Sequence, residues 1–104
     1  MQERKVSARK MAAHAVKLIQ HHFGKKKVTA TPLTGGISNH VFLTKYGREK
    51  LVVRLSSDPN KLEGFQKEQW AVARAKEKGV PVPEILEVGN TIIPMPYMIV
   101  RKID

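Results

Sequence analysis

Cysteine is absent from the 104-residue chain, so disulfide bonds are excluded and nothing indicates an oxidising compartment. No apolar run approaches the roughly 20 residues that a membrane-spanning helix needs. The N-terminal segment is basic, but it lacks the continuous apolar stretch of a secretory signal peptide. We therefore expect a cytoplasmic protein with no membrane partner.

Two common phosphate-binding motifs are also missing. The sequence has no GxxxxGK followed by Ser or Thr, which excludes a Walker-type phosphate loop. It also has no strand, glycine turn and helix in succession, which excludes a Rossmann site. His14 and His21 lie seven residues apart on a predicted helix, but with no cysteine and few acids nearby the ligand set for a metal is incomplete. We predict no metal site in this chain.

Acidic residues are scarce, and the charge is uneven. The chain has 19 Lys and Arg against 9 Asp and Glu, a net charge of +10. Most of the excess lies in residues 1–30, and this leaves two interpretations open. One is a stand-alone basic module that binds nucleic acid or an acidic partner through residues 4–27. The other, which we favour, is a piece of a larger protein whose overall charge is balanced, for which nucleic-acid binding is not expected.

Periodicity and end signals predict two helices. Apolar residues at helical spacing predict the first over 7–23, with Ser7 as its N-cap. The second is predicted over 61–78, where Asn60 and Glu63 approximate a capping box. Glycines that follow each helix are predicted to end it. They are Gly24 and Gly79.

The remaining apolar segments are predicted to form a sheet. The predicted strands cover 28–33, 40–45, 49–55, 84–89 and 97–103. Gly47 supplies the unusual backbone conformation of a hairpin turn, and the short connections favour antiparallel pairing. Trp70, on the second helix, is predicted to lie in the core. We therefore predict one α+β domain: a five-stranded antiparallel sheet with one packed long helix plus an N-terminal helix.

The most informative segment is the small-residue sequence TGGISNHV at 34–41, between the first two predicted strands. Gly35 and Gly36 allow the backbone to approach a ligand closely, which leaves N–H groups free to meet phosphate oxygens. Ser38 and Asn39 add short hydrogen-bonding side chains. Taken alone, the segment is more readily interpreted as a polar hairpin loop than as a phosphate-binding loop.

A basic residue on the third predicted strand strengthens the case for an anion site. Arg54 lies two residues from Val52, so both side chains share one face of the sheet. The opposite face, toward the helix and the core, carries Leu51, Val53 and Leu55. A single charge on an apolar face is unfavourable unless an anion is near. The alternative interpretation is that Arg54 is a surface residue on a half-solvated sheet. Glu68, near the middle of the second helix, is placed to meet Arg54, and a phosphate could take the remaining guanidinium donors.

Four segments together are specific for a family. They are TGGISNHVF, KLVVRL, FQKEQWAVARAKEKGVPVPEIL and PYMIVRKID. They resemble the N-terminal lobe of the aminoglycoside phosphotransferase and choline-kinase-like family, which shares the protein-kinase fold. The resemblance divides the chain into a basic helical segment at 1–27 and a kinase-like N-lobe at 28–104 that ends at the hinge.

The resemblance implies ATP as cofactor. The loop at 34–39 would cover the ATP phosphates, with Ser38 as the main side-chain contact. Arg54 would stand in the place of the lysine that contacts the α- and β-phosphates and pairs with a helix glutamate, here Glu68. The family pattern is met only in part, because Thr34 and Asn39 replace two glycines of GxGxxG and an arginine replaces the lysine.

The adenine end of the site is implied by the same resemblance. Val41 and Val52 would form a roof over the adenine. Val100 would take the gatekeeper position at the back of the site. The backbones of Arg101 and Ile103 would hydrogen-bond the edge of the adenine ring.

In this family the catalytic and the metal-binding aspartates belong to a second lobe, and this chain ends at Asp104, where the hinge would continue. We therefore expect an isolated N-lobe with no catalytic residue, which is inactive alone. A third interpretation stays open, in which the exposed face that would meet the second lobe drives self-association. In a full-length enzyme it would serve transfer of the ATP γ-phosphate to a hydroxyl of a small substrate. Magnesium is expected only with the missing C-terminal lobe.

Overall fold

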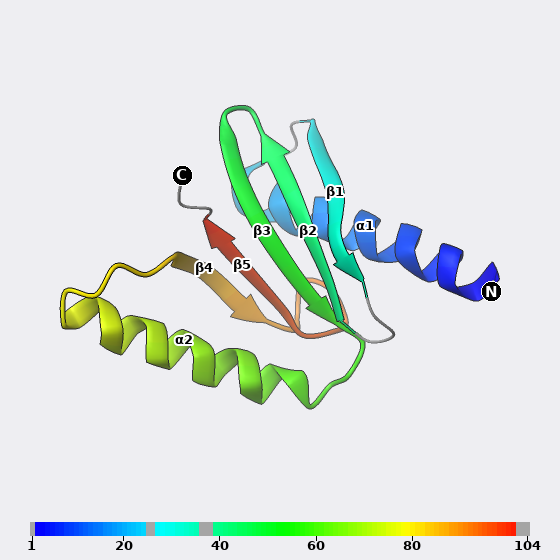
Figure 1. The fold of residues 1–104 in the computed structure, drawn as a ribbon. Coiled ribbons are helices and arrows are strands. Elements are labelled where there is room, and N and C mark those ends of the chain that lie inside the picture. Colours follow the sequence, from blue (N-terminus) through cyan, green and yellow to red (C-terminus); the bar gives the residue numbers. More distant parts are fainter. Residues whose placement is uncertain (1, 25–26, 36–38, 102–104) are drawn as a thin grey trace.

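A computed structural model shows an antiparallel sheet with two helices, and it describes residues 2–24, 27–35 and 39–101 (Figure 1). The elements in chain order are α1 (Gln2–Phe23), β1 (Val28–Gly35), β2 (Asn39–Tyr46), β3 (Glu49–Ser56), α2 (Lys61–Glu77), β4 (Glu84–Gly89) and β5 (Tyr97–Arg101). The predicted α+β class is confirmed. No helix within the described ranges is long and apolar enough to cross a membrane.

The sheet has the strand order β1-β2-β3-β5-β4, and each neighbouring pair is antiparallel. Gly47 turns β2 into β3 with a φ of 59°, as predicted. β1 and β2 extend beyond their predicted ends, because pairing continues to Gly35 on β1 and includes Asn39 and Tyr46 on β2. The connection between them is therefore shorter than the predicted loop. The end of the predicted last strand, at 102–103, lies outside the described residues.

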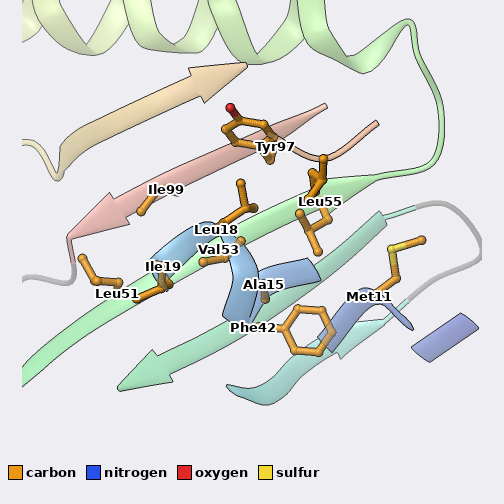
Figure 2. Close-up of a cluster of buried hydrophobic side chains, with 11 residues drawn as sticks. Met11, Ala15, Leu18, Ile19, Phe42, Leu51, Val53, Leu55, Tyr97 and Ile99 are labelled. Carbon is orange, nitrogen blue, oxygen red and sulfur yellow. The ribbon is translucent and has the colours of Figure 1, made fainter. Parts of the chain in front are cut away.

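The main core lies between α1 and one face of the sheet (Figure 2). The helix contributes Met11, Ala15, Leu18 and Ile19, each at most 5% exposed, as the sequence pattern predicts. The sheet contributes Phe42, Leu51, Val53, Leu55, Tyr97 and Ile99. Burial of each large apolar side chain stabilises the fold by about 1.5–3 kcal/mol. The helix over the buried face of β3 is therefore α1, the N-terminal one.

The start of α1 differs from the prediction. The helix begins at Gln2, so Ser7 lies inside it and is not its N-cap. The segment before Ser7 contains glutamate, arginine and lysine, which have high helix propensity. Nothing in that segment stops the helix, which therefore continues toward the N-terminus.

α2 runs along β4 and β5, away from the main core (Figure 1). Within α2 only Phe65 is buried, so this helix has no extended core face. Trp70 is 66% exposed, and its predicted place in the core is wrong. Its ring lies instead 5.4 Å from the guanidinium carbon of Arg74. The physical reason is that α1 already covers the large apolar face, which leaves α2 a narrower contact.

The two ends of α2 test two capping predictions. Asn60 makes no side-chain capping bond and has a helical backbone, so the predicted capping box is wrong. Its N–H instead donates to Oδ1 of Asp58 at 3.0 Å. Gly79 ends the helix as predicted, with a φ of 79°. Its N–H and that of Val80 each donate to a carbonyl of the last turn at 3.0 Å, a Schellman motif.

The side chain of Tyr97 on β5 leaves no room for a side chain at Gly89. A Cβ at this position would lie 2.8 Å from Oη of Tyr97. The ring cannot easily move, because Tyr97 is 1% exposed and donates to Oε2 of Glu87 at 2.7 Å. We expect Gly89→Ala to lower the free energy of unfolding by about 1–3 kcal/mol.

The matched control is Gly64→Ala, since a Cβ there meets nothing within 4 Å. Alanine in the interior of α2 is expected to raise the free energy of unfolding by about 0.5–1 kcal/mol. Urea unfolding of both variants measures the difference. Effects of the same sign would contradict the steric explanation for Gly89.

Candidate functional site

Cross-strand pairing brings predicted site residues together on the face of the sheet opposite the main core. Arg54 pairs with Val41 on β2 and with Met98 on β5, and Val52 pairs with Val100. Directly paired residues of an antiparallel sheet share one face, so these five side chains form a continuous strip. We call it the open strip.

Apart from Arg54, the open strip is apolar. Met98 is fully buried, whereas Val41, Val52 and Val100 are only half-buried. The valines alternate along their strands with residues that α1 covers. Such a half-buried apolar surface can favour the binding of a flat apolar ligand, because binding removes the remaining apolar area from water.

Arg54 reaches from β3 to α2. Its Nη1 donates to Oε2 of Glu68 at 2.7 Å, and it lies 3.8 Å from Sδ of Met98. Its guanidinium carbon is 5.2 Å from the ring centroid of Phe65. The contact between Arg54 and Glu68 that the sequence predicts is therefore present. The two side chains are 37% and 45% exposed, so the ion pair contributes little stability and chiefly holds the guanidinium in place.

This arrangement leaves part of the guanidinium available. A guanidinium has five N–H donors, and the hydrogen bonds of Arg54 within the described part of the chain use Nη1. The donors on Nη2 and Nε suit a bidentate acceptor such as a phosphate. Arg54 can therefore bind Glu68 and an oxyanion at the same time.

A small cavity lies beside Arg54, where β2 and β3 approach the first turns of α2. Its volume is about 120 Å³, and its lining residues are Asn39, His40, Val41, Arg54, Leu55, Lys61 and Phe65. Lys61 is exposed, whereas His40 is 8% exposed. The Nε2 atom of His40 is buried and has no hydrogen-bond partner among the described residues. The His40 ring lies on the same face of the sheet as Phe42 and Leu55, so the cationic side chains that line the cavity are Arg54 and Lys61.

The phosphotransferase enzyme family matches residues 29–104, which is most of the chain. The chain belongs to this phosphotransferase family. The predicted family is confirmed by a match that begins within β1 and takes in the open strip, Arg54 and α2. A comparison with curated proteins gave no significant match.

Two solved structures share the fold of this phosphotransferase-family chain. One is a thermostable mutant of aminoglycoside phosphotransferase APH(4)-Ia in a ternary complex with AMP-PNP and hygromycin B. It is 25% identical, with a TM-score of 0.64 over 83% of this chain and 28% of that one. The other is an APH(2″) enzyme with GDP and kanamycin, 18% identical, with a TM-score of 0.63 over 88% of this chain and 30% of that one. This chain spans less than a third of the length of either enzyme.

The predicted phosphate loop of this family member is described only at its ends. Gly35 is the last residue of β1 and Asn39 the first of β2, so both belong to strands and not to the loop. Their positions still place them at the edge of the cavity, because Asn39 lines it and Gly35 pairs with His40. Some predicted site residues lie outside the described residues. They are Gly36, Ser38 and Ile103.

The side chain of Arg101 points away from the open strip. It pairs with Glu84 at 2.7 Å and lies 3.4 Å from Glu49, which ties β5 to its two neighbours. The predicted role of Arg101 in this family concerns its backbone, and the side-chain contacts do not bear on that role.

Four lining residues of the cavity are not among the predicted site residues: His40, Leu55, Lys61 and Phe65. Lys61 was only the first residue of a predicted helix, and His40 the first residue of a predicted strand. Their proximity depends on where the chain turns after β3. The available signal was the short link between β3 and α2, which holds the first turn of the helix near the end of the strand.

The histidines of α1 do not form a metal centre in the part of the chain that the structure describes. No group of three or more metal-ligating side chains was found there. His22 instead has Nδ1 at 3.3 Å from Oε1 of Glu87. Burial, with help from the charges of Lys10 and Lys17, lowers the pKa of His14 below its ordinary value.

Proposed function

We propose that this chain is the ATP-binding N-lobe of a small-molecule phosphotransferase. The observation that carries the proposal is the 2.7 Å pair between Arg54 and Glu68 at the end of an open apolar strip. Membership of the phosphotransferase enzyme family supports the reaction class. AMP-PNP, an analogue of ATP, is bound to one structural neighbour.

Arg54 is proposed to contact the α- and β-phosphates. Glu68 fixes the guanidinium through Nη1, so the donors on Nη2 and Nε are oriented before the ligand arrives. Orientation in advance reduces the conformational entropy that is lost on binding. Glu68 also offsets the charge of Arg54 when no phosphate is present.

The open strip is proposed to receive the adenine. Val41 and Val52 would pack on one face of the ring, and Val100 would lie behind it. The backbones of Arg101 and Ile103 would meet its polar edge. The proposed phosphate-covering residues are Gly35, Gly36, Ser38 and Asn39.

The complete reaction belongs to a longer protein in this proposal. The structural neighbours bind hygromycin B and kanamycin. We propose an acceptor of similar chemistry, a hydroxyl-bearing amino sugar or amino alcohol. The γ-phosphoryl group of ATP would pass to that hydroxyl, with the catalytic aspartate and magnesium supplied by a second lobe. The lobe described here contributes nucleotide positioning and charge neutralisation.

Titration of the chain with ATP and with adenosine tests this function. We expect saturable binding of both, with ATP about a hundredfold tighter, because more than one charge-assisted hydrogen bond to Arg54 adds to the apolar contact. Protein-detected NMR titration is the measurement, since it reports weak affinities. Absence of saturable ATP binding would overturn the proposal.

A further inference from the structure

We propose that the solvent-facing side of α1 binds the phosphate backbone of double-stranded nucleic acid. Exposed side chains define this surface, which we call the outer face of α1; they are Arg9, Lys10, Ala13, Lys17 and His21. α1 covers the face of the sheet opposite the open strip, so the outer face is separate from the proposed nucleotide site.

The charges of the chain are segregated along the sequence. No Asp or Glu occurs between Glu3 and Glu49, whereas this stretch contains ten Lys and Arg. From Glu49 onward the chain is nearly balanced, with nine Lys and Arg against eight Asp and Glu. The net charge of +10 therefore comes almost entirely from the part of the chain that contains α1.

Helical spacing gathers the cations of α1 on one side. Lys10 and Lys17 are seven residues apart, about two turns, so they lie on the same side of the helix. Arg9 is adjacent to Lys10 and is also exposed. The opposite side of α1 is buried against the sheet, and its residues there are Met11, Ala15, Leu18 and Ile19.

Arg9, Lys10 and Lys17 form no ion pair with the described residues, whose ion pairs draw their acids from residue 49 onward. Burial, together with the charges of Lys10 and Lys17, lowers the pKa of His14, which lies between them on the helix. An uncompensated row of like charges produces a positive potential that attracts a polyanion. A balanced charge elsewhere in a larger protein, the interpretation favoured from the sequence, leaves this arrangement on one face unexplained.

The spacing of the cations matches a duplex. Arg9 and Lys17 are eight residues apart, about 12 Å along the helix, and the same length of duplex carries about seven phosphates. Ala13 lies between them and is small, so it does not keep the cationic side chains from the phosphates. The N-terminal end of α1 extends past the edge strand β1, where a long ligand can approach it (Figure 1).

The composition of the outer face favours a duplex over other anionic partners. Single strands are bound mainly by aromatic rings on which bases stack, and the only ring on the outer face is the imidazole of His21. A membrane-surface helix inserts its apolar face into lipid, whereas that of α1 is buried against the sheet. Protein partners are usually anchored by large apolar or aromatic groups, and the apolar residue here is Ala13.

The first test removes the charges and keeps the helix. One variant combines Arg9→Gln, Lys10→Gln and Lys17→Gln, since glutamine has nearly the same helix propensity as the residues that it replaces. The matched control has the same net charge and changes three exposed cations at the β2–β3 hairpin. Its substitutions are Lys45→Gln, Arg48→Gln and Lys50→Gln. Circular dichroism checks the fold, and fluorescence anisotropy measures binding to a mixed-sequence DNA duplex over a range of salt concentrations.

We expect the unsubstituted chain to bind the duplex with a dissociation constant of about 10⁻⁴–10⁻⁶ M at physiological salt. The α1 variant should bind about a hundredfold more weakly at low salt. Its plot of log K against log salt should be shallower by about 2.7, since each phosphate contact contributes about 0.9. The hairpin variant should keep the affinity and the slope. Equal losses in both variants would assign the effect to net charge and overturn the proposal.

A second test leaves every cation in place. Ala13→Glu introduces a negative charge in the middle of the outer face, and Ala13→Gln introduces a side chain of the same size without the charge. We expect duplex binding to weaken about tenfold with glutamate and to be unchanged with glutamine. The same affinity in both variants would contradict a phosphate contact at this face.

The class of ligand is tested with the unsubstituted chain and the α1 variant. The probes are the DNA duplex, a single strand of the same length, vesicles containing phosphatidylserine, and poly-glutamate. We expect the duplex to bind most tightly and to show the largest loss in the α1 variant. Tighter binding of any other probe would overturn the assignment to a duplex. Absence of salt-dependent duplex binding would overturn the proposal altogether.

Discussion

Leu18→Ala is expected to lower the free energy of unfolding by about 2–5 kcal/mol, the range for truncating a fully buried leucine. Leu18 is 0% exposed and lies between α1 and the sheet (Figure 2). Domains of this size are stable by only about 5–15 kcal/mol, so the loss is a large fraction of the total. Urea unfolding followed by circular dichroism measures it.

The matched control is Leu33→Ala on β1. Leu33 is 52% exposed, so the same truncation removes little buried area. We expect a change within about 0.5 kcal/mol. A comparable loss in both variants would contradict the view that α1 and the sheet share one core. If the loss in Leu18→Ala is as small as that expected for Leu33→Ala, Leu18 is not buried in solution.

Arg54→Met is expected to weaken ATP binding about a hundredfold, because it removes more than one charge-assisted hydrogen bond to phosphate. Methionine keeps apolar contact with Phe65 and Met98, so the free energy of unfolding should change by less than about 1 kcal/mol. Binding of adenosine should be unaffected. Calorimetric titration with ATP and adenosine, together with urea unfolding, measures all three quantities.

Arg74→Met serves as the control for charge. Arg74 also lies over an aromatic ring, that of Trp70, but it is in the last turn of α2 and does not line the cavity. Its loss should leave ATP affinity unchanged. If both arginine variants weaken ATP to the same degree, the effect is one of net charge, and the proposed contact between Arg54 and phosphate is wrong.

Much of the fold is predictable because its signals are local. Alternation along β3 separates the core residues from Arg54, and glycines with positive φ mark the hairpin turn and the end of α2. The pairing of Arg54 with Glu68 is also predictable, since it needs only a strand followed by a helix. The family resemblance adds the residues of the open strip, whose roles in binding ATP stay predictions.

The errors concern contacts between elements. Trp70 is apolar and lies on a helix, but whether it is buried depends on how much of the sheet α1 already covers. The backbone of Asn60 is set by the Asp58 turn, which prevents the predicted cap. The cavity depends on the approach of α2 to β2, which spacing alone does not specify. The alternative use of residues 4–27, binding to nucleic acid or an acidic partner, stays a prediction.

The alternation along β3 has a consequence for tolerance to mutation. Leu51, Val53 and Leu55 are packed under α1, whereas Val52 and Arg54 belong to the opposite face. A complete set of single substitutions along this strand should therefore give two interleaved profiles. Changes at the odd-numbered positions should lower the amount of folded protein, and changes at the even-numbered ones should leave that amount high while ligand affinity falls. Substitutions along this one strand would thus separate the requirement for folding from the requirement for ligand binding, residue by residue.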